Sequence, residues 1–242
     1  MLVFAFVVAV PAGPVWSAER DYDACVAQTA EAPQEALESA RRWRLETGEL
    51  AARHCLSLAL VALERYGEAA AELTELAAAS TDAPAEHQAA LFSQAGHAWL
   101  LAEQFDLSER AFDRALDLTP GDVDLLIDRA QARTAGANNW DALADLNSAL
   151  SAAPQRADAL IYRATIYRSL GANDLAKKDV TQALSIEPSN ANALVERGIL
   201  FLAADDVAAA RSDFGRVLVT APRSEAAEVA QEFLAELDRE EQ

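Results

Sequence analysis

Residues 116–130 read LDLTPGDVDLLIDRA, and Pro120 stands between two runs that are both helical in character. A proline inside a helix removes a hydrogen bond and ends or kinks that helix. Prolines recur at positions 120, 154, 188 and 222, always 34 residues apart. Constant spacing of this kind indicates an internal repeat. We therefore interpret Pro120 as the terminator of one repeat, and not as a kink or a boundary between unlike domains.

The residues before each proline repeat in type as well as in spacing. Small residues stand 24 and 12 positions before it, and large apolar residues stand eight positions before it. Two helices approach closely only where their side chains are small, so the pattern predicts a packed helix pair in each repeat. In chain order the three sets are Gly96, Ala130, Ala164 and Gly198; Ser108, Ala142, Ala176 and Ala210; and Phe112, Leu146, Val180 and Phe214.

This pattern resembles the tetratricopeptide repeat (TPR) family. Four repeats keep the spacing, although Ser108 replaces the usual Ala and Arg133 the usual aromatic residue; they span 89–122, 123–156, 157–190 and 191–224. The resemblance implies an all-α, right-handed superhelical solenoid of antiparallel helix pairs, whose first helices line a concave groove. In the last repeat the family's Leu, Gly, aromatic, Ala, Phe and Pro positions are Leu194, Gly198, Phe201, Ala210, Phe214 and Pro222.

The pattern weakens on both sides of the segment 85–222, which is assigned to the four regular repeats. A degenerate TPR unit is expected over 49–84 and a degenerate helical pair over 18–48. Residues 223–242 are expected to form a C-terminal capping helix with a charged outer face. Ala and Leu dominate the composition, which also favours packed helices over sheets.

The first 17 residues, MLVFAFVVAVPAGPVWS, carry no charge. Their apolar run is too short to span a bilayer, and we interpret 1–17 as a signal peptide with cleavage after Ser17 or Ala18. No Lys or Arg precedes the run, and a short hydrophobic anchor is the alternative. The interpretation predicts export to the periplasm or cell envelope, or secretion, without stable membrane insertion of the mature chain.

Cys25 and Cys55 are the only cysteines. In an exported protein such a pair predicts a disulfide, here tying an expected helix over 20–31 to one over 49–64. Two buried thiols are the alternative. Zinc is disfavoured, because His54 beside Cys55 belongs to no C-x-x-C or H-x-x-x-H pattern.

The formal net charge of −19 argues against nucleic acid as a partner, because binding to phosphates requires surface Lys and Arg. An anionic membrane surface would repel the chain for the same reason. Solubility of an Ala-rich chain is one explanation for the acidity, and a preference for basic partners is another.

Helical geometry predicts which side chains line the groove, because they point away from the small residue of each first helix. This lining is polar and mainly acidic, so complementarity favours a protein or peptide partner that carries Lys, Arg or amide groups. A merely solvated face is the alternative for each residue. The expected lining is Gln94, His97, Asp124, Asp128, Gln131, Asp158, Tyr162, Thr165, Arg168, Asn192 and Glu196.

One TPR subgroup clamps acidic C-terminal tails of chaperones with Lys, Asn and Arg at fixed groove positions. Here those places hold Ser93, His97, Asp128, Asp158 and Tyr162. Because no basic clamp exists, this class of ligand is not expected.

The sequence predicts no catalytic residue, metal or cofactor, because the three histidines belong to no recognisable nucleophile or metal motif. The TPR resemblance implies a non-catalytic adaptor or scaffold that binds a peptide or partner protein in its groove. One alternative is a structural assembly factor of a multi-protein envelope complex that uses convex or terminal surfaces. Another is a binder of small molecules or glycans, or an enzyme, centred on His97, Gln131, Tyr162 and Arg168.

Overall fold

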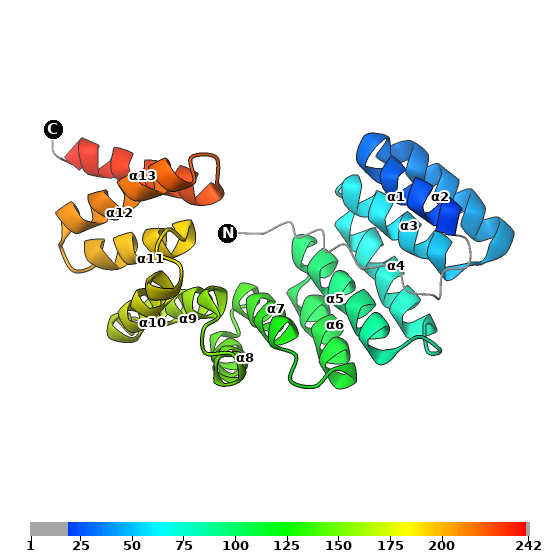
Figure 1. The fold of residues 1–242 in the computed structure, drawn as a ribbon, viewed down its shortest axis with the longest axis horizontal. Coiled ribbons are helices and arrows are strands. Elements are labelled where there is room, and N and C mark those ends of the chain that lie inside the picture. The colour runs from blue at the N-terminus through cyan, green and yellow to red at the C-terminus, as the bar shows by residue number, and fades with distance from the viewer. Residues whose placement is uncertain (1–18, 241–242) are drawn as a thin grey trace. The chain divides into compact units, whose positions relative to one another are not determined.

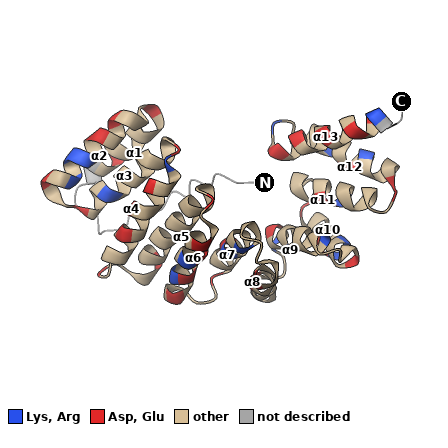
Figure 2. Cartoon of the chain, turned by 180° about the vertical axis from the view of Figure 1, so that it is seen from behind, with Lys and Arg blue, Asp and Glu red and all other residues tan. Residues whose placement is uncertain are grey.

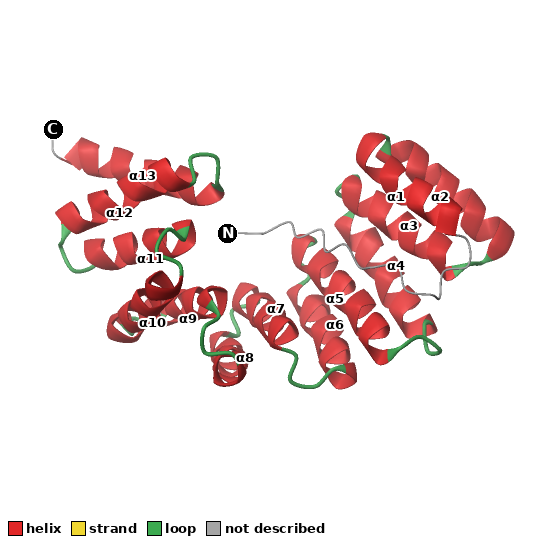
Figure 3. Cartoon of the chain, in the orientation of Figure 1, coloured by secondary structure: helices red, strands yellow, loops and turns green. Residues whose placement is uncertain are grey.

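The computed structural model describes residues 19–240, so the predicted signal peptide and its cleavage site lie outside the described residues. Every regular element within 19–240 is an α-helix, which confirms the all-α prediction (Figure 3). The chain divides into two compact units between Asn138 and Asn139, and each is described by itself. This division falls inside the predicted repeat 123–156.

Consecutive helices within each unit are joined by short turns, which makes neighbours antiparallel (Figure 1). The N-terminal unit contains α1 (Glu19–Glu31), α2 (Pro33–Thr47), α3 (Leu50–Ala62), α4 (Tyr66–Ala79), α5 (Ala85–Leu101), α6 (Phe105–Leu118) and α7 (Val123–Ala135). The C-terminal unit contains α8 (Asn139–Ala152), α9 (Ala157–Ser169), α10 (Asn173–Ile186), α11 (Ala191–Leu202), α12 (Val207–Thr220) and α13 (Glu225–Glu240).

The small residue of a first helix makes room for the large residue of the second helix. A Cβ atom built on Gly198 would lie 2.5 Å from the ring of Phe214, and one built on Gly96 would lie 2.7 Å from the ring of Phe112. Both rings are fully buried. Where the large residue is the smaller Val180, the facing position holds alanine. The two positions therefore vary together, and glycine stands where the partner is phenylalanine.

The two departures from the family pattern each have a structural reason. Ser108 is fully buried, and its hydroxyl donates to the carbonyl oxygen of Gly96 at 2.7 Å. It thus stays small at the helix crossing and adds a hydrogen bond there. Arg133 stands where other repeats have an aromatic residue, and its Nε donates to Glu109 on α6 at 2.8 Å. At this position the chain therefore has an ion pair between α6 and α7 in place of an aromatic side chain.

In each of the last two repeats, an ion pair with a buried aspartate joins the first helix to the second. Neither pair was predicted from the sequence. Arg163 donates to Asp179 and Arg197 donates to Asp213, in each case over 16 residues. Hydrogen bonds that each guanidinium donates to its carboxylate raise the pKa of Arg163 and Arg197 above the usual value. Because a buried charge is costly without a partner, each pair favours one register between its helices. The signal was present in the sequence, since Arg and Asp recur with this spacing in three repeats.

Helix α13 packs on α11 and α12 at the end of the chain. The ring of Phe233 stacks on Phe214 with centroids 5.2 Å apart, and Arg211 forms an ion pair with Asp238 at 2.6 Å. The outer face of α13 is mostly charged, including exposed Glu228. The helix therefore covers apolar side chains of the last repeat while presenting charge to solvent.

Candidate partner-binding surface

Two predicted groove residues meet in the N-terminal unit. Nε2 of His97 on α5 lies 3.1 Å from a carboxylate oxygen of Asp128 on α7, and both side chains are partly exposed. The His97 ring also packs edge-on against Phe112, with centroids 5.2 Å apart. Asp124, one turn before Asp128, is exposed, and Gln131 is half-buried. This part of α7 thus presents polar side chains next to a fixed imidazole.

Gln94, which is half-buried, belongs to a chain of hydrogen bonds that connects α1, α3 and α5. Its Oε1 atom lies 2.8 Å from Nε2 of His54, and the hydroxyl of Tyr22 lies 2.6 Å from Nδ1. Because Oε1 only accepts, Nε2 carries the proton, and Nδ1 of the neutral ring accepts from Tyr22. Burial, aided by the charge of Asp23, raises the pKa of Tyr22 to about 12, so the phenol stays protonated.

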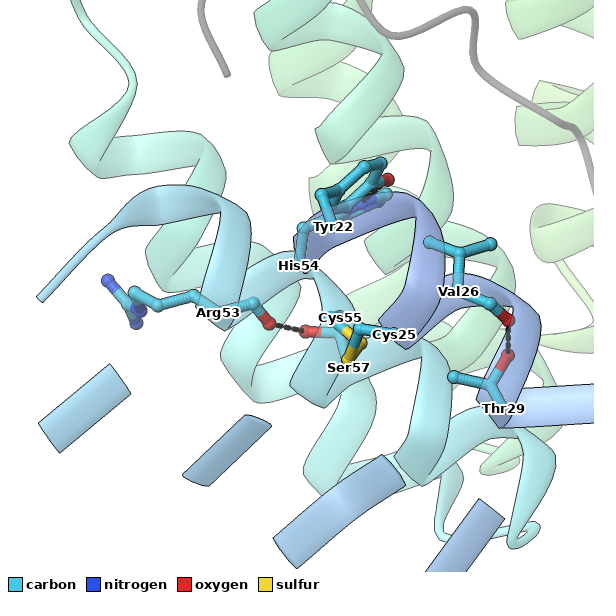
Figure 4. The surroundings of a disulfide bond; sticks show 8 residues. All are labelled: Tyr22, Cys25, Val26, Thr29, Arg53, His54, Cys55 and Ser57. Carbon is cyan, nitrogen blue, oxygen red and sulfur yellow. Dashed lines mark hydrogen bonds between the residues drawn. A yellow bond between two sulfur atoms is a disulfide. The ribbon is translucent and has the colours of Figure 1, made fainter. Parts of the chain in front are cut away.

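The predicted disulfide is present between Cys25 on α1 and Cys55 on α3, with Cα atoms 6.2 Å apart (Figure 4). Tyr22 lies one turn before Cys25, and His54 precedes Cys55 in the chain. The same helix pair is thus joined by a covalent bond and by a buried hydrogen bond. Within residues 19–240 no cluster of three or more His, Cys, Asp or Glu side chains is placed to hold a metal ion.

The stability of the N-terminal unit should depend on the protonation of His54. Burial lowers the pKa of this histidine below 6.5, although the bond to Gln94 opposes the shift. The unfolded chain therefore binds the proton more readily, and stability present above about pH 6.5 is lost as pH falls through that value. Between the unfolded and folded pKa values the loss is about 1.4 kcal/mol per pH unit.

Urea unfolding measured across this pH range checks the prediction. His54→Gln removes the titrating group, and its difference from the wild type isolates the His54 contribution from that of the many carboxylates. We expect the variant to have a shallower pH dependence near pH 6. Parallel pH profiles for the two proteins would contradict the assignment.

Three predicted groove residues meet in the C-terminal unit. Arg168 on α9 donates through Nε and Nη2 to the two carboxylate oxygens of Glu196 on α11, at 2.5 and 3.2 Å. The hydroxyl of Thr165 lies 3.2 Å from the same carboxylate. Glu196 is buried, whereas the Arg168 side chain retains 29% exposure. Glu196 therefore holds Arg168 in place, and the guanidinium is the accessible member of the pair.

The remaining predicted residues of this unit lie on the same two first helices. Asp158 is bound by Arg156, two residues earlier, at 2.6 Å. Tyr162 and Asn192 are half-buried. No hydrogen bond joins Asn192 to another predicted residue in the part of the chain that the structure describes.

Comparison with solved structures shows that the chain has the TPR fold. A TPR protein from Parabacteroides merdae aligns with a TM-score of 0.65 and 19% identity over 91% of this chain and 85% of its own. PilF from Pseudomonas aeruginosa aligns with a TM-score of 0.62 and 14% identity over 90% and 98%.

A further TPR structure is YrrB, described as having an unusual peptide-binding site. It aligns with a TM-score of 0.53 and 16% identity over 81% of this chain and 99% of its own. No protein-family model matches the sequence. No curated protein matches it either.

Proposed function

We propose that the protein is a non-catalytic adaptor whose first helices hold a peptide or partner protein. The observation that carries this proposal is a pair of side-chain interactions between the first helices of neighbouring repeats. His97 on α5 pairs with Asp128 on α7, and Arg168 on α9 pairs with Glu196 on α11. Polar groups fixed before binding lose little conformational freedom when a ligand arrives. The TPR fold and the peptide-binding site ascribed to YrrB support the same class of function.

The chemistry of these side chains favours a ligand with basic or amide groups. Asp124 is exposed, and Asp128 and Asp158 are partly exposed. Carboxylates at a binding surface attract Lys and Arg and repel acidic segments. Arg168, held by Glu196, supplies a donor for a ligand carbonyl or carboxylate. We therefore assign to the polar surface of each unit, taken by itself, a peptide with positive or amide side chains that is bound without turnover.

We also propose that the protein works in the periplasm or cell envelope. The disulfide between Cys25 and Cys55 supports an oxidising compartment. Within the described residues, no helix is both long enough and apolar enough to span a bilayer.

Paired substitutions with a charge-matched control test the groove. Asp124→Asn/Asp128→Asn removes two carboxylates from α7, whereas Glu225→Gln/Glu228→Gln removes two exposed carboxylates from α13. We expect in-cell crosslinking followed by mass spectrometry to give the same partners for wild type and control. The amount of each partner captured by the α7 variant should fall by about tenfold, because the two removed charges lie at the proposed interface.

Arg168→Gln provides the corresponding test in the C-terminal unit. Circular dichroism of each variant verifies that the helices remain folded. If both groove variants capture the same proteins as the wild type, the groove proposal is wrong. That result would favour a structural assembly factor that uses other surfaces.

A further inference from the structure

The side-chain amide of Gln94 is held from behind by a buried histidine. Its Oε1 atom lies 2.8 Å from Nε2 of His54, and the other ring nitrogen of His54 lies 2.6 Å from the hydroxyl of Tyr22. Figure 4 shows Tyr22 and His54 beside each other where α1 meets α3. Both residues are buried, so these polar groups depend on one another for hydrogen bonds. The position of the Gln94 amide is therefore set by residues of two other helices.

The direction of these hydrogen bonds decides which end of the Gln94 amide is available to a ligand. Oε1 accepts from the N–H group at Nε2 of His54, and Tyr22 donates to Nδ1. Turning the amide over would place the N–H donors of Gln94 against the N–H donor of His54. The amide thus stays in one orientation as long as the ring proton remains on Nε2. In that orientation Nε2 of Gln94 is directed away from His54.

The amide nitrogen of Gln94 is an unused hydrogen-bond donor. Within residues 19–240 it forms no hydrogen bond, and it is not one of the buried unpaired atoms, so it is open to solvent. Gln94 lies on α5 one turn before His97, whose ring contacts Asp128 on α7. Two N–H groups fixed before binding therefore stand on the same polar surface, and they lose little conformational freedom when they bind a ligand.

The charges on this surface disfavour a carboxylate as the acceptor for these donors. Asp124 and Asp128 lie on the neighbouring first helix, and both are at least partly exposed. Arg53, next to His54 in the chain, is bound by two glutamates of α4. Figure 2 shows further acidic positions, in red, on the helices of the N-terminal unit. An anionic ligand group would be repelled here, whereas an uncharged carbonyl oxygen accepts hydrogen bonds without this cost.

We propose that Gln94 binds an uncharged amide carbonyl of the peptide ligand, and that His54 and Tyr22 are positioning residues that keep its N–H donors turned toward that ligand. This role rests on the proposed groove function, and it specifies which chemical group the N-terminal unit recognises. The carbonyl belongs either to the main chain of the ligand or to an Asn or Gln side chain. In both cases a group that can only donate would meet the N–H donors of Gln94 and leave them unpaired.

Fluorescence anisotropy with synthetic peptides tests the role of Gln94. The probe is a fluorescein-labelled peptide of alternating Ser and N,N-dimethylasparagine, whose side-chain carbonyls accept hydrogen bonds while their nitrogens cannot donate. Gln94→Glu keeps an oxygen for His54 but replaces the outward donors by an acceptor. We expect this variant to bind the probe about tenfold more weakly or worse. Gln231→Glu adds the same charge at an exposed position of α13 and should bind as the wild type does.

Two further peptides define the group that is recognised. An alternating Asp and Ser peptide should bind the wild type more weakly than the probe, because its side chains are anionic. An alternating Ala and Ser peptide offers main-chain carbonyls only. If it binds as tightly as the probe, Gln94 binds the main chain, and if it binds more weakly, Gln94 binds the side chain.

Nitrogen NMR of the imidazole ring tests the positioning role of His54 and Tyr22. At about pH 8, above the usual pKa of histidine, His54 of the wild type should carry its proton on Nε2. Tyr22→Phe removes the hydroxyl that donates to Nδ1, so the tautomer with the proton on Nδ1 should become populated. The Gln94 amide can then turn over, and the affinity for the probe should fall several-fold. A purely structural role of Tyr22 would change the stability but neither the tautomer nor the affinity.

Three results would count against this role of Gln94. Equal affinity of the wild type and Gln94→Glu for the probe would overturn it alone and leave the groove proposal standing. A wild-type His54 with its proton on Nδ1 would also overturn it, because the amide would then present its oxygen to the ligand. Absence of binding to every peptide at about 1 mM would overturn it together with the groove proposal for the N-terminal unit.

Discussion

Replacing Phe214 by alanine will lower the free energy of unfolding of the C-terminal unit by about 3–5 kcal/mol. The side chain is fully buried, faces Gly198 on α11 and stacks on Phe233 of α13. Its removal leaves a cavity at the junction of three helices. Hydrogen exchange measured by mass spectrometry checks the result, because peptides from α11 and α12 should lose protection while those from α3 keep theirs.

A second substitution separates this contact from a general loss of core volume. In the wild type, Gly198→Ala places a Cβ atom 2.5 Å from the Phe214 ring and should destabilise the unit. In the Phe214→Ala background the ring is gone. The same change should then stabilise by about 1 kcal/mol, because alanine is the better helix former. Gly198→Ala should therefore destabilise the wild type but stabilise the Phe214→Ala variant.

Gly215, also on α12, is the matched control, because a Cβ atom there meets nothing within 4 Å. Gly215→Ala should be stabilising in both backgrounds. Equal effects of Gly198→Ala in the two backgrounds would mean that positions 198 and 214 do not interact, since independent substitutions add.

The fold could be predicted from the sequence because the residues that specify it lie close together in the chain and recur in every repeat. Each proline ends a second helix, and the small and large residues recur at fixed distances from it. The division between Asn138 and Asn139 was not predictable in this way. The repeat around it keeps its small residue, Ala130, and its large residue, Leu146, at the regular spacing.

The hydrogen bonds and ion pairs of the candidate surface were harder to predict from the sequence than the residues that form it. Thr165, Arg168 and Glu196 were all expected on the groove, but Glu196 is 28 residues from Arg168 and 31 from Thr165. Such pairs depend on how neighbouring repeats stack, which the 34-residue spacing does not specify. His54 is the clearest case, because its partners lie 32 and 40 residues away. The sequence disfavours zinc at His54 and contains no local pattern that indicates these partners.

Breaking the disulfide will destabilise the N-terminal unit by about 3–4 kcal/mol, the chain-entropy estimate for a loop of this size. The bond joins residues 30 positions apart, and both cysteines are buried between α1 and α3. Denaturant unfolding of the wild type with and without reductant measures the effect. Cys25→Ala/Cys55→Ala should resemble the reduced protein and should no longer respond to reductant.

The oxidation state of Cys25 and Cys55 in the native protein tests the compartment in which the protein functions. Thiols stay reduced in the cytosol of most organisms and pair in the periplasm or outside the cell. Protein isolated from its native compartment without reduction should therefore resist alkylation at Cys25 and Cys55. Chain retained in the cytosol, after deletion of residues 1–17, should be alkylated at both and unfold at lower denaturant. Two free thiols in the native protein would remove the principal support for export, whereas the TPR fold of both units would be unaffected by that result.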